Sequence, residues 1–582
     1  MGFNYLSESI MPNYFTGNAD LLFHFNRLNL EEATSILESG YSYQEKFPFA
    51  PKNYPEALEN YRNAMVLAGD IAGNFIAPRS AQIDMDGSQL KDGKVTYAKG
   101  SSESYKQLAD AGFTGTILPY EYGGLNFPAT IYMMLIELVS RGDAAMMTMI
   151  GYQDIGEAIS KFGTKEVCEE YLPKYISGEH IGSMVMTEPA AGSDLQAIQL
   201  KAYQDDEGNW FLKGNKHFIS NGCGDMLLVL ARSEEGKSMF GLSLFACHGG
   251  EKVNVVHVEE KMGLHGSPTC QLYFDDAPVK LVGKRKQGLL HVLYVLNHAR
   301  FSVAAQALGI AEAAYHEANE YAKIREQFNK IIYKMSPVAN MLIDMRVAIE
   351  SSRSLLYAGA QWLDLRNNLE EKVAHLKAEG QPFEEEKKRF NEAAKMVDLL
   401  SPLAKYVITE MAVKACYDAQ QIHGGMGYMR EMKIERLARD VRITTIYEGT
   451  SQIHILGASK NVINDILKDF FEKNEKKDFG KKLLTSLKRI KEIRVLFLES
   501  LALVKAHESI DFRTVAAKAL VDMYGYIYTG YLLLNEAYIA ERKGLIANRY
   551  INSSLAKSLA SLATIKNNQY DDLDNIDEIC NV

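Results

Sequence analysis

The sequence predicts a mainly α-helical protein with a small β-domain near its middle. Apolar residues recur at helical spacing before about residue 181 and after about residue 289. Between these regions, short apolar or alternating runs are separated by clusters of Gly, Asn and Asp, which is typical of strands. The chain has 582 residues, of which 47% are hydrophobic. It is too long for one hydrophobic core, so several domains are expected.

The first 181 residues are expected to be largely helical. Residues 1–53 contain one short helical pattern at 28–37, and we interpret them as an arm packed on a larger body. Residues 54–181 form a helical domain, because helical spacing runs through 61–71, 131–140 and 154–162. Gly112 and the pair Gly123 and Gly124 provide turns between these helices.

Residues 182–288 are expected to form an antiparallel β-barrel domain. The apolar runs that predict its strands lie at 210–212, 226–230, 239–246, 253–258 and 270–274.

Helical spacing then returns, and residues 289–471 are expected to form a four-helix bundle. The four long segments are 290–325, 335–368, 383–415 and 451–471. Residues 472–582 are expected to be an additional helical extension behind a charged linker. The tail from about Asn567 holds five acidic residues before Cys580, and we expect it to be disordered.

Composition excludes several classes of function. The net charge of −10 argues against nucleic acid as a partner. The six cysteines form no C-x-x-C pair and no His lies at metal-ligand spacing, so we expect reduced thiols and no metal site. No secretory signal and no apolar run of membrane-spanning length is found, so a cytoplasmic location is expected.

Residues 473–494 contain nine Lys or Arg residues interleaved with Leu and Ile. This pattern resembles a helix that lies on a membrane surface. Acidic residues also intervene, which favours a solvated linker helix leading into a domain that packs on the bundle. Membrane association through 473–494 remains the alternative.

Three motifs carry candidate chemistry. In the first, Glu448 precedes Gly449 and Thr450 at the start of a helical pattern, where Thr450 or Ser451 can serve as N-cap. On its own the motif is a helix start with a favourable charge.

The second motif, residues 186–194, contains Thr187 and Ser193 at the entrance to the β-domain. Alone it is a turn. Phe218 and Ser220 end a strand further on, and two such edges could hydrogen-bond the polar rim of a flat heterocycle while Phe218 covers one face.

The third motif combines Arg325 and Phe328 at a helix end with the glycine-rich stretch 421–427, which includes Gln421 and Gly425. An Arg beside a Phe is more often a surface charge with a core neighbour. The glycines do not follow a strand of a βαβ unit, so they are not a Rossmann fingerprint, but they permit close approach to a phosphate or sugar.

The ordered set of these motifs, from about residue 60 to 460, resembles the acyl-CoA dehydrogenase family. The extension is similar to that of the longer members, which include very-long-chain and methylmercaptopropionyl-CoA dehydrogenases. The resemblance implies an N-terminal helical domain, an antiparallel β-barrel and a C-terminal four-helix bundle, with an added helical domain. It also implies FAD as cofactor, a homodimer, and oxidation of an acyl-CoA thioester to a trans-2-enoyl-CoA, the reaction type of fatty-acid β-oxidation. The implied electron acceptor is an electron-transferring flavoprotein.

The resemblance also implies roles for single residues. Glu448 is the base, and Tyr447 and Gly449 line the substrate. Thr187 and Ser220 hydrogen-bond the flavin, and Phe218 stands where the family usually has Trp. Ser193 and Arg300 are implied to contact CoA. The residues implied to reach the FAD of the neighbouring subunit are Arg325, Phe328, Gln421 and Gly425. Thr450 and Gln452 are implied to contact the adenine and pyrophosphate of FAD.

Three departures from the family pattern stand out. Asn329 replaces a Gly, and Asn297 replaces an Asp of the medium-chain branch. Another branch has its base just before the residue matching Arg300, where this chain has Ala299, which leaves Glu448 as the base. An oxygen-dependent acyl-CoA oxidase, or a non-catalytic acyl-CoA-binding or assembly protein on the same fold, remain alternatives. The length and branching of the acyl chain are not predicted.

Overall fold

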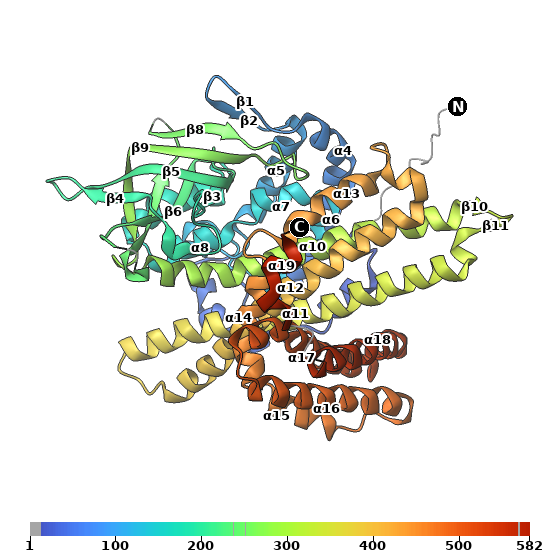
Figure 1. Ribbon diagram of the computed structural model, residues 1–582. Helices are drawn as coiled ribbons and strands as arrows, with labels where there is room; N and C mark the ends of the chain where they lie inside the picture. Colours follow the sequence, from blue (N-terminus) through green and yellow to red (C-terminus); the bar gives the residue numbers. More distant parts are fainter. Residues whose placement is uncertain (1–12, 237, 251, 568–570, 582) are drawn as a thin grey trace.

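Long helices form the centre of the molecule, and a β-barrel lies at one end of them (Figure 1). The computed structural model describes residues 13–236, 238–250, 252–567 and 571–581. The start of the predicted N-terminal arm, residues 1–12, lies outside the described residues.

The region before the barrel is mostly helical, as the spacing predicts. Its helices are α1 (Ala19–Phe25), α2 (Glu31–Leu37), α3 (Tyr54–Asp70), α4 (Ala77–Asp86), α5 (Lys99–Asp110), α6 (Ala129–Gly142), α7 (Ala144–Ile150), α8 (Gln153–Phe162) and α9 (Lys165–Ile176). A short hairpin, β1 (Gln89–Lys91) and β2 (Lys94–Thr96), is an element that we did not predict. Helix α6 is buried along its whole length, and the Asp364 carboxylate caps it by accepting from the backbone N–H groups of Ala129 and Thr130 at 2.5 and 3.1 Å.

The barrel contains β3 (Gly182–Val185), β4 (Lys201–Gln204), β5 (Trp210–Ser220), β6 (Met226–Arg232), β7 (Leu242–His248), β8 (Val253–Val258) and β9 (Thr269–Val282). Pairings β5–β9, β9–β7, β7–β6, β6–β4 and β4–β5 close a ring, and β8 adds to β9. The purely antiparallel prediction is wrong in one respect, because β3 and β4 pair with β6 in parallel. Parallel pairing is possible here because β4 and β5 lie in the chain between β3 and β6 and provide the long connection that it requires.

Three helices of the predicted bundle are long: α10 (Gly288–Ile324), α11 (Ser336–Ala378) and α12 (Glu384–His423). The fourth predicted helix is divided into α14 (Ser451–Ile463) and α15 (Lys468–Glu475), because Asp465 takes a left-handed conformation with φ of 51°. The small hairpin β10 (Glu326–Gln327) and β11 (Lys330–Ile331) lies at the end of the bundle away from the barrel (Figure 1). Helix α13 (Lys433–Val441) contacts the loop between β8 and β9, where the Leu264 N–H donates to the Asp440 carboxylate at 2.7 Å.

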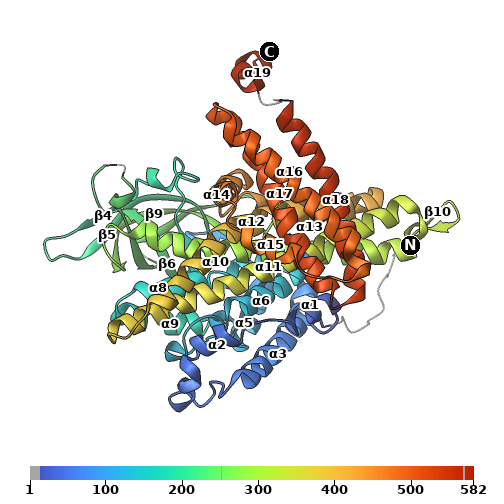
Figure 2. The ribbon, with the colours of Figure 1, turned by 90° about the horizontal axis from the view of Figure 1, so that it is seen from below.

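The extension consists of α16 (Leu484–Ala506), α17 (Ile510–Ala537), α18 (Glu541–Lys566) and α19 (Ile576–Cys580). Helix α17 packs against α11, α12 and α14, and α18 packs against α11, so these helices cover one side of the bundle (Figure 2). Residues 571–580 form short helical turns, so the prediction of a disordered tail is wrong there. Residues 568–570 and 582 of the tail lie outside the described residues.

Most of the apolar side chains in the basic stretch 473–494 are buried in the protein. Leu483, Leu487 and Ile490 are buried, and only Leu484 among the interleaved residues is exposed. This burial favours the linker-helix interpretation, because a helix lying on a membrane needs those side chains at its surface. In the part of the chain that the structure describes, no helix combines the length and apolarity needed to cross a membrane.

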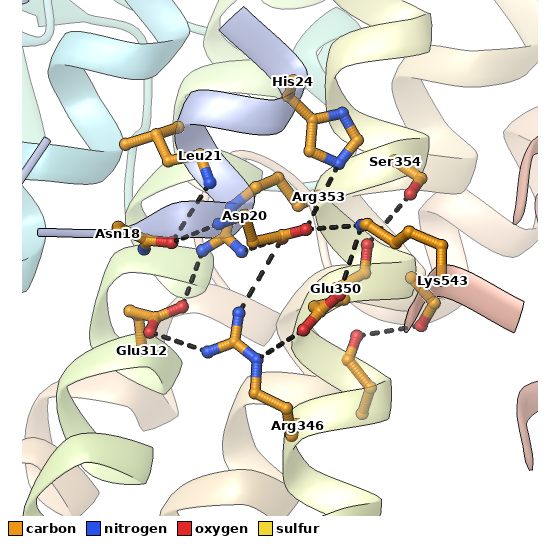
Figure 3. Close-up of polar contacts among 12 residues, drawn as sticks. Asn18, Asp20, Leu21, His24, Glu312, Arg346, Glu350, Arg353, Ser354 and Lys543 are labelled. Atoms are coloured by element: carbon orange, nitrogen blue, oxygen red, sulfur yellow. Dashed lines mark hydrogen bonds and ion pairs between the residues drawn. The ribbon is translucent and has the colours of Figure 1, made fainter. Parts of the chain in front are cut away.

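A buried ionic network joins the arm, the bundle and the extension (Figure 3). Its centre is Arg353 of α11, which is fully buried and pairs with Glu312 at 2.7 Å, with Glu137 at 2.6 Å and with Asp20. Lys543 of α18 reaches the same group through Asp20 and through Glu350 at 3.2 Å. These buried ion pairs join five helices that are far apart in sequence: α1, α6, α10, α11 and α18.

Candidate active site

The loop that holds Glu448 is kept in an unusual conformation by buried side chains. Glu448 and Gly449 have φ of 55° and 95°, in the left-handed region that glutamate rarely adopts. The Lys405 ammonium donates to the Gly449 carbonyl at 2.6 Å, and His454 Nε2 donates to the Glu448 carbonyl at 3.0 Å. Of the two predicted candidates, Thr450 rather than Ser451 is the N-cap of α14. These bonds hold a strained residue in place, which is common at functional sites.

The Glu448 carboxyl group is suited to act as a base. Its Oε2 atom is buried and has no hydrogen-bond partner among the described residues. Burial raises its pKa above the ordinary value, whereas the positive charges of Lys405 and Arg300 lower it. Within the same described part of the chain, the Glu448 backbone N–H makes no hydrogen bond, so it can donate to a ligand.

Thr187 and Ser220 lie at two barrel edges, each of which is held by a hydrogen bond to its backbone carbonyl. The His217 N–H donates to the Thr187 carbonyl at 2.9 Å, and the Ser183 hydroxyl donates to the Ser220 carbonyl at 2.7 Å. Glu188, in the turn at residues 186–194, forms a buried ion pair with Lys216 of β5 at 2.9 Å. This pair holds the turn against β5.

Phe218 lies at a bulge between these edges, with φ of 58° and 59% of its side chain exposed. Two hydroxyl groups beside one exposed aromatic ring fit the rim and face of a flavin. The residues present therefore fit FAD at this position.

Tyr152, which precedes α8, connects the Glu448 loop to the barrel. Burial raises the pKa of Tyr152 and the Glu448 carboxylate raises it further, whereas a hydrogen bond with the Ser220 side chain lowers it. Tyr447 is anchored by a hydrogen bond from its hydroxyl to Gln306 of α10. Tyr447 interacts electrostatically with Tyr152 and with Glu448, so both tyrosines lie near the base.

The residues assigned to CoA lie in different surroundings. Ser193 is exposed in the turn after β3. Arg300 is half-buried on α10, donates to Asn297 at 3.3 Å and interacts electrostatically with Glu448 and Asp398. The structure thus places Arg300 beside the base, and its contact with CoA stays a prediction.

A second group of predicted residues lies far from Glu448. Arg325 and Phe328 follow the end of α10, and Gln421 and Gly425 lie at the end of α12, where the rings of Tyr321 and His423 stack at 4.4 Å. Phe328 is 91% exposed. Arg300 and Arg325 are 25 residues apart on α10, which corresponds to about 37 Å along a helix. Residues near Glu448 and residues near Arg325 could contact one FAD molecule of the same chain only if that molecule spanned about 37 Å.

Gln452 is exposed at the first turn of α14, on the same loop as Glu448.

Four residues near Glu448 were missed by the sequence analysis: Tyr152, Asp154, Lys405 and His454. Lys405 lies within a long helix and is fully buried, and burial lowers its pKa to about 7. Lys405 belongs to none of the motifs, and only the packing of α12 against the loop places it there.

Comparisons with known proteins show the family of the chain. Descriptions of the acyl-CoA dehydrogenase family match the chain in its N-terminal domain at residues 66–179, in its middle domain at 183–277 and in its C-terminal domain at 286–386 and 387–463. The chain belongs to the acyl-CoA dehydrogenase family. A 3-methylmercaptopropionyl-CoA dehydrogenase of Ruegeria pomeroyi is 34% identical in an alignment that covers 68% of this chain and 69% of that protein.

Solved structures give the same result. The butyryl-CoA dehydrogenase of Megasphaera elsdenii has a TM-score of 0.59 and 30% identity, covering 69% of this chain and 98% of that one. An acyl-CoA dehydrogenase of Bacillus anthracis in complex with FAD has a TM-score of 0.72 over 87% of this chain and 88% of that one, but at 22% identity it shows the fold alone. The predicted class, an FAD-dependent acyl-CoA dehydrogenase with further C-terminal helices, is confirmed.

Proposed function

We propose that the protein oxidises an acyl-CoA thioester to its trans-2-enoyl-CoA and passes the electrons to an electron-transferring flavoprotein. The observation that carries this proposal is the Glu448 carboxyl group, which has one buried oxygen without a hydrogen-bond partner among the described residues. Tyr152 interacts with both this carboxyl group and the Ser220 side chain. FAD, when bound, accepts the hydride that leaves the β-carbon.

The chain's own residues prepare the thioester. Glu448 removes the α-proton, and its raised pKa brings the base closer to the pH at which it works. The free Glu448 N–H donates to the thioester carbonyl, where negative charge develops. Tyr447 and Gly449 line the acyl group, Ser193 and Arg300 bind CoA, and the Thr187 and Ser220 hydroxyls hold the flavin rim.

The direct test is the flavin spectrum. The purified protein should be yellow, with about one FAD per chain, and acyl-CoA added without oxygen should bleach it. Reoxidation by an electron-transferring flavoprotein, and slow reoxidation by oxygen, support a dehydrogenase. Rapid reoxidation by oxygen identifies an oxidase, and a colourless protein that cannot take up FAD contradicts the proposal.

We propose further that the protein is a homodimer in which Arg325, Phe328, Gln421 and Gly425 contact the FAD of the partner subunit. Gly425 and its neighbour Gly424 have open space around their backbone, which allows close approach of a ligand. The distance along α10 separates this group from the Glu448 loop of its own chain, and the exposed Phe328 suits an interface. Thr450 and Gln452 complete the adenine and pyrophosphate contacts.

Arg325→Ala is expected to weaken FAD retention by about tenfold or more, since one charged contact to a phosphate is lost. FAD content after dialysis measures this. Lys323→Ala removes a cation from the same helix end, where Lys323 pairs with Glu320 at 2.7 Å, and should leave retention unchanged. If Arg325→Ala binds FAD as tightly as the native protein does, Arg325 does not contact the FAD of the partner subunit.

Lys405→Met is expected to move the acidic limb of the pH–rate profile to higher pH. The Lys405 charge lowers the pKa of Glu448, so its removal makes the carboxylate harder to form. Activity should therefore require a higher pH, because only the ionised Glu448 accepts a proton. Lys405→Arg keeps the charge and should shift the limb much less; an unshifted limb in Lys405→Met contradicts the electrostatic role.

A further inference from the structure

His454, in the first turn of α14, contacts the loop that carries the base. The residue is buried, with 1% of its surface exposed. Its Nε2 atom lies 3.0 Å from the Glu448 carbonyl oxygen. The imidazole ring also packs against Gly449, since a Cβ atom added there would come within 2.9 Å of Nε2. One side chain therefore both hydrogen-bonds the loop and fills the space beside it.

The direction of this hydrogen bond fixes the state of the imidazole. A carbonyl oxygen only accepts, so Nε2 of His454 carries the ring proton. Burial and the charges of Lys405 and Arg300 lower the pKa of His454 to about 3, although the bond to the Glu448 carbonyl raises it. The ring is therefore neutral at neutral pH, and its single N–H is the one given to the loop. In the part of the chain that the structure describes, Nδ1 has no hydrogen-bond partner.

Glu448 needs such a donor because its backbone is strained. With φ of 55°, its Cβ atom crowds the neighbouring backbone. The same backbone angles decide where the carboxyl group and the backbone N–H point. On the N-terminal side, Tyr447 is anchored through its hydroxyl to Gln306. On the C-terminal side, the His454 bond holds the Glu448 carbonyl, so the strained residue is fixed at both ends.

Lys405 does not replace this bond. Its ammonium group donates to the next carbonyl, that of Gly449, at 2.6 Å. Gly449 has no Cβ atom and adopts many backbone conformations at little cost, so fixing its carbonyl leaves the Glu448 peptide able to rotate. No other residue that the structure describes donates to the Glu448 carbonyl. The conformation of the base therefore depends on His454.

We propose that His454 is a positioning residue, whose Nε2–H holds the Glu448 backbone so that the carboxyl group meets the α-proton while the Glu448 N–H meets the thioester carbonyl. This proposal rests on the proposed function. The proton leaves as negative charge develops on the carbonyl oxygen, so one change of backbone angle weakens both interactions together. His454 acts through Glu448 and needs no contact with the thioester.

The test compares two amide side chains that differ in length. Glutamine carries its amide nitrogen about as far from the backbone as histidine carries Nε2, whereas asparagine is one methylene shorter. His454→Gln should keep the rate of flavin reduction by acyl-CoA within about threefold of native, whereas His454→Asn should lower it by about 10²-fold, as for a lost oxyanion donor. The loss should appear in kcat with KM little changed, because the interaction acts in the transition state.

A second measurement does not depend on turnover. Acetoacetyl-CoA has an acidic α-carbon and a β-carbonyl group in place of the β-hydrogens, so it forms an enolate without reducing flavin. Since the Glu448 N–H stabilises the enolate oxygen, the pKa of bound acetoacetyl-CoA should rise by about two units in His454→Asn and stay near native in His454→Gln. Ultraviolet absorbance of the enolate during a pH titration measures this.

FAD content and Tm of both variants distinguish positioning from a purely structural role. The proposal requires the asparagine and glutamine variants to differ in rate and in enolate pKa at similar FAD content. If the two variants behave alike, whether both match the native protein or both lose activity and Tm together, the proposal is overturned.

The outcomes also separate this proposal from the proposed function. If acyl-CoA bleaches the native flavin and His454→Asn bleaches at the same rate, His454 does not position the base and the dehydrogenase assignment stands. If saturated acyl-CoA thioesters of every length fail to bleach the native flavin, while acetoacetyl-CoA ionises on the native protein more readily than on His454→Asn, the positioning role stands and the dehydrogenase assignment is wrong.

Discussion

Glu448→Gln is expected to lower the rate of flavin reduction by acyl-CoA by about 10²- to 10⁴-fold, the usual effect of losing a general base. Glutamine keeps the size of the side chain and most of its hydrogen bonding, but it cannot take the α-proton. FAD content and thioester binding should remain near native, because the backbone N–H of residue 448 is retained. Stopped-flow measurement of flavin bleaching without oxygen gives the rate directly.

Glu410→Gln is the matched control. Glu410 is an exposed carboxylate on α12 that accepts a hydrogen bond from Ser451 at 2.5 Å, so it lies near the same loop without entering the site. Its replacement should change the bleaching rate by less than about tenfold. A Glu448→Gln variant that bleaches at the native rate would show that another group removes the proton.

Local patterns predicted most of the fold. Helical spacing identified α6, α8 and the three long bundle helices, since each has a continuous apolar stripe. The β1–β2 hairpin was missed although Asp92 and Gly93, both with positive φ, form a recognisable turn signal. The break at Asp465 could not be predicted in this way, because Asp465 pairs with Arg494 of the extension, a contact that local spacing does not show.

The site was predictable only where a motif is continuous in sequence. Glu448, Thr187 and Ser220 each stand in a short stretch with glycine or hydroxyl neighbours, and their order along the chain carried the resemblance. His454 and Lys405 stand within helices, and their importance comes from what packs against them. Burial, which decides the pKa of both groups, is a property of the assembled structure.

The same reasoning applies to the ionic network that holds the extension on the bundle. Arg353 has no sequence signature, yet its guanidinium pairs with carboxylates from α1, α6 and α10. Burial alone would raise the pKa of Glu312 and Asp20. The positive charges of Arg346 and Arg353 hold the pKa of Glu312 below the usual range of a carboxyl group, and those of Arg353, His24 and Lys543 do the same for Asp20. The network is therefore sensitive to the loss of its central cation.

Arg353→Met is expected to lower the free energy of unfolding by about 3–5 kcal/mol, because three buried carboxylates lose a partner while the apolar volume is roughly kept. Urea unfolding, followed by circular dichroism at neutral pH, measures this change. Arg549→Met is the control: Arg549 pairs with Asp344 at 2.8 Å on the surface, where such a pair contributes at most about 1 kcal/mol.

The pH dependence gives the second test of the same variant. Because the pKa values of Asp20 and Glu312 are lowered in the folded protein, their stabilising contribution is present above the unfolded pKa of about 4 and is lost as the pH falls. In Arg353→Met both carboxyl groups lose one of the positive charges that keep them ionised. The difference in stability between the two proteins should therefore be largest at neutral pH and should shrink in acid. Two outcomes would contradict this role of the network: a difference in free energy of unfolding below about 1 kcal/mol at pH 7, or a difference that grows as the pH falls. Either result would mean that charge does not hold the arm and the extension on the bundle.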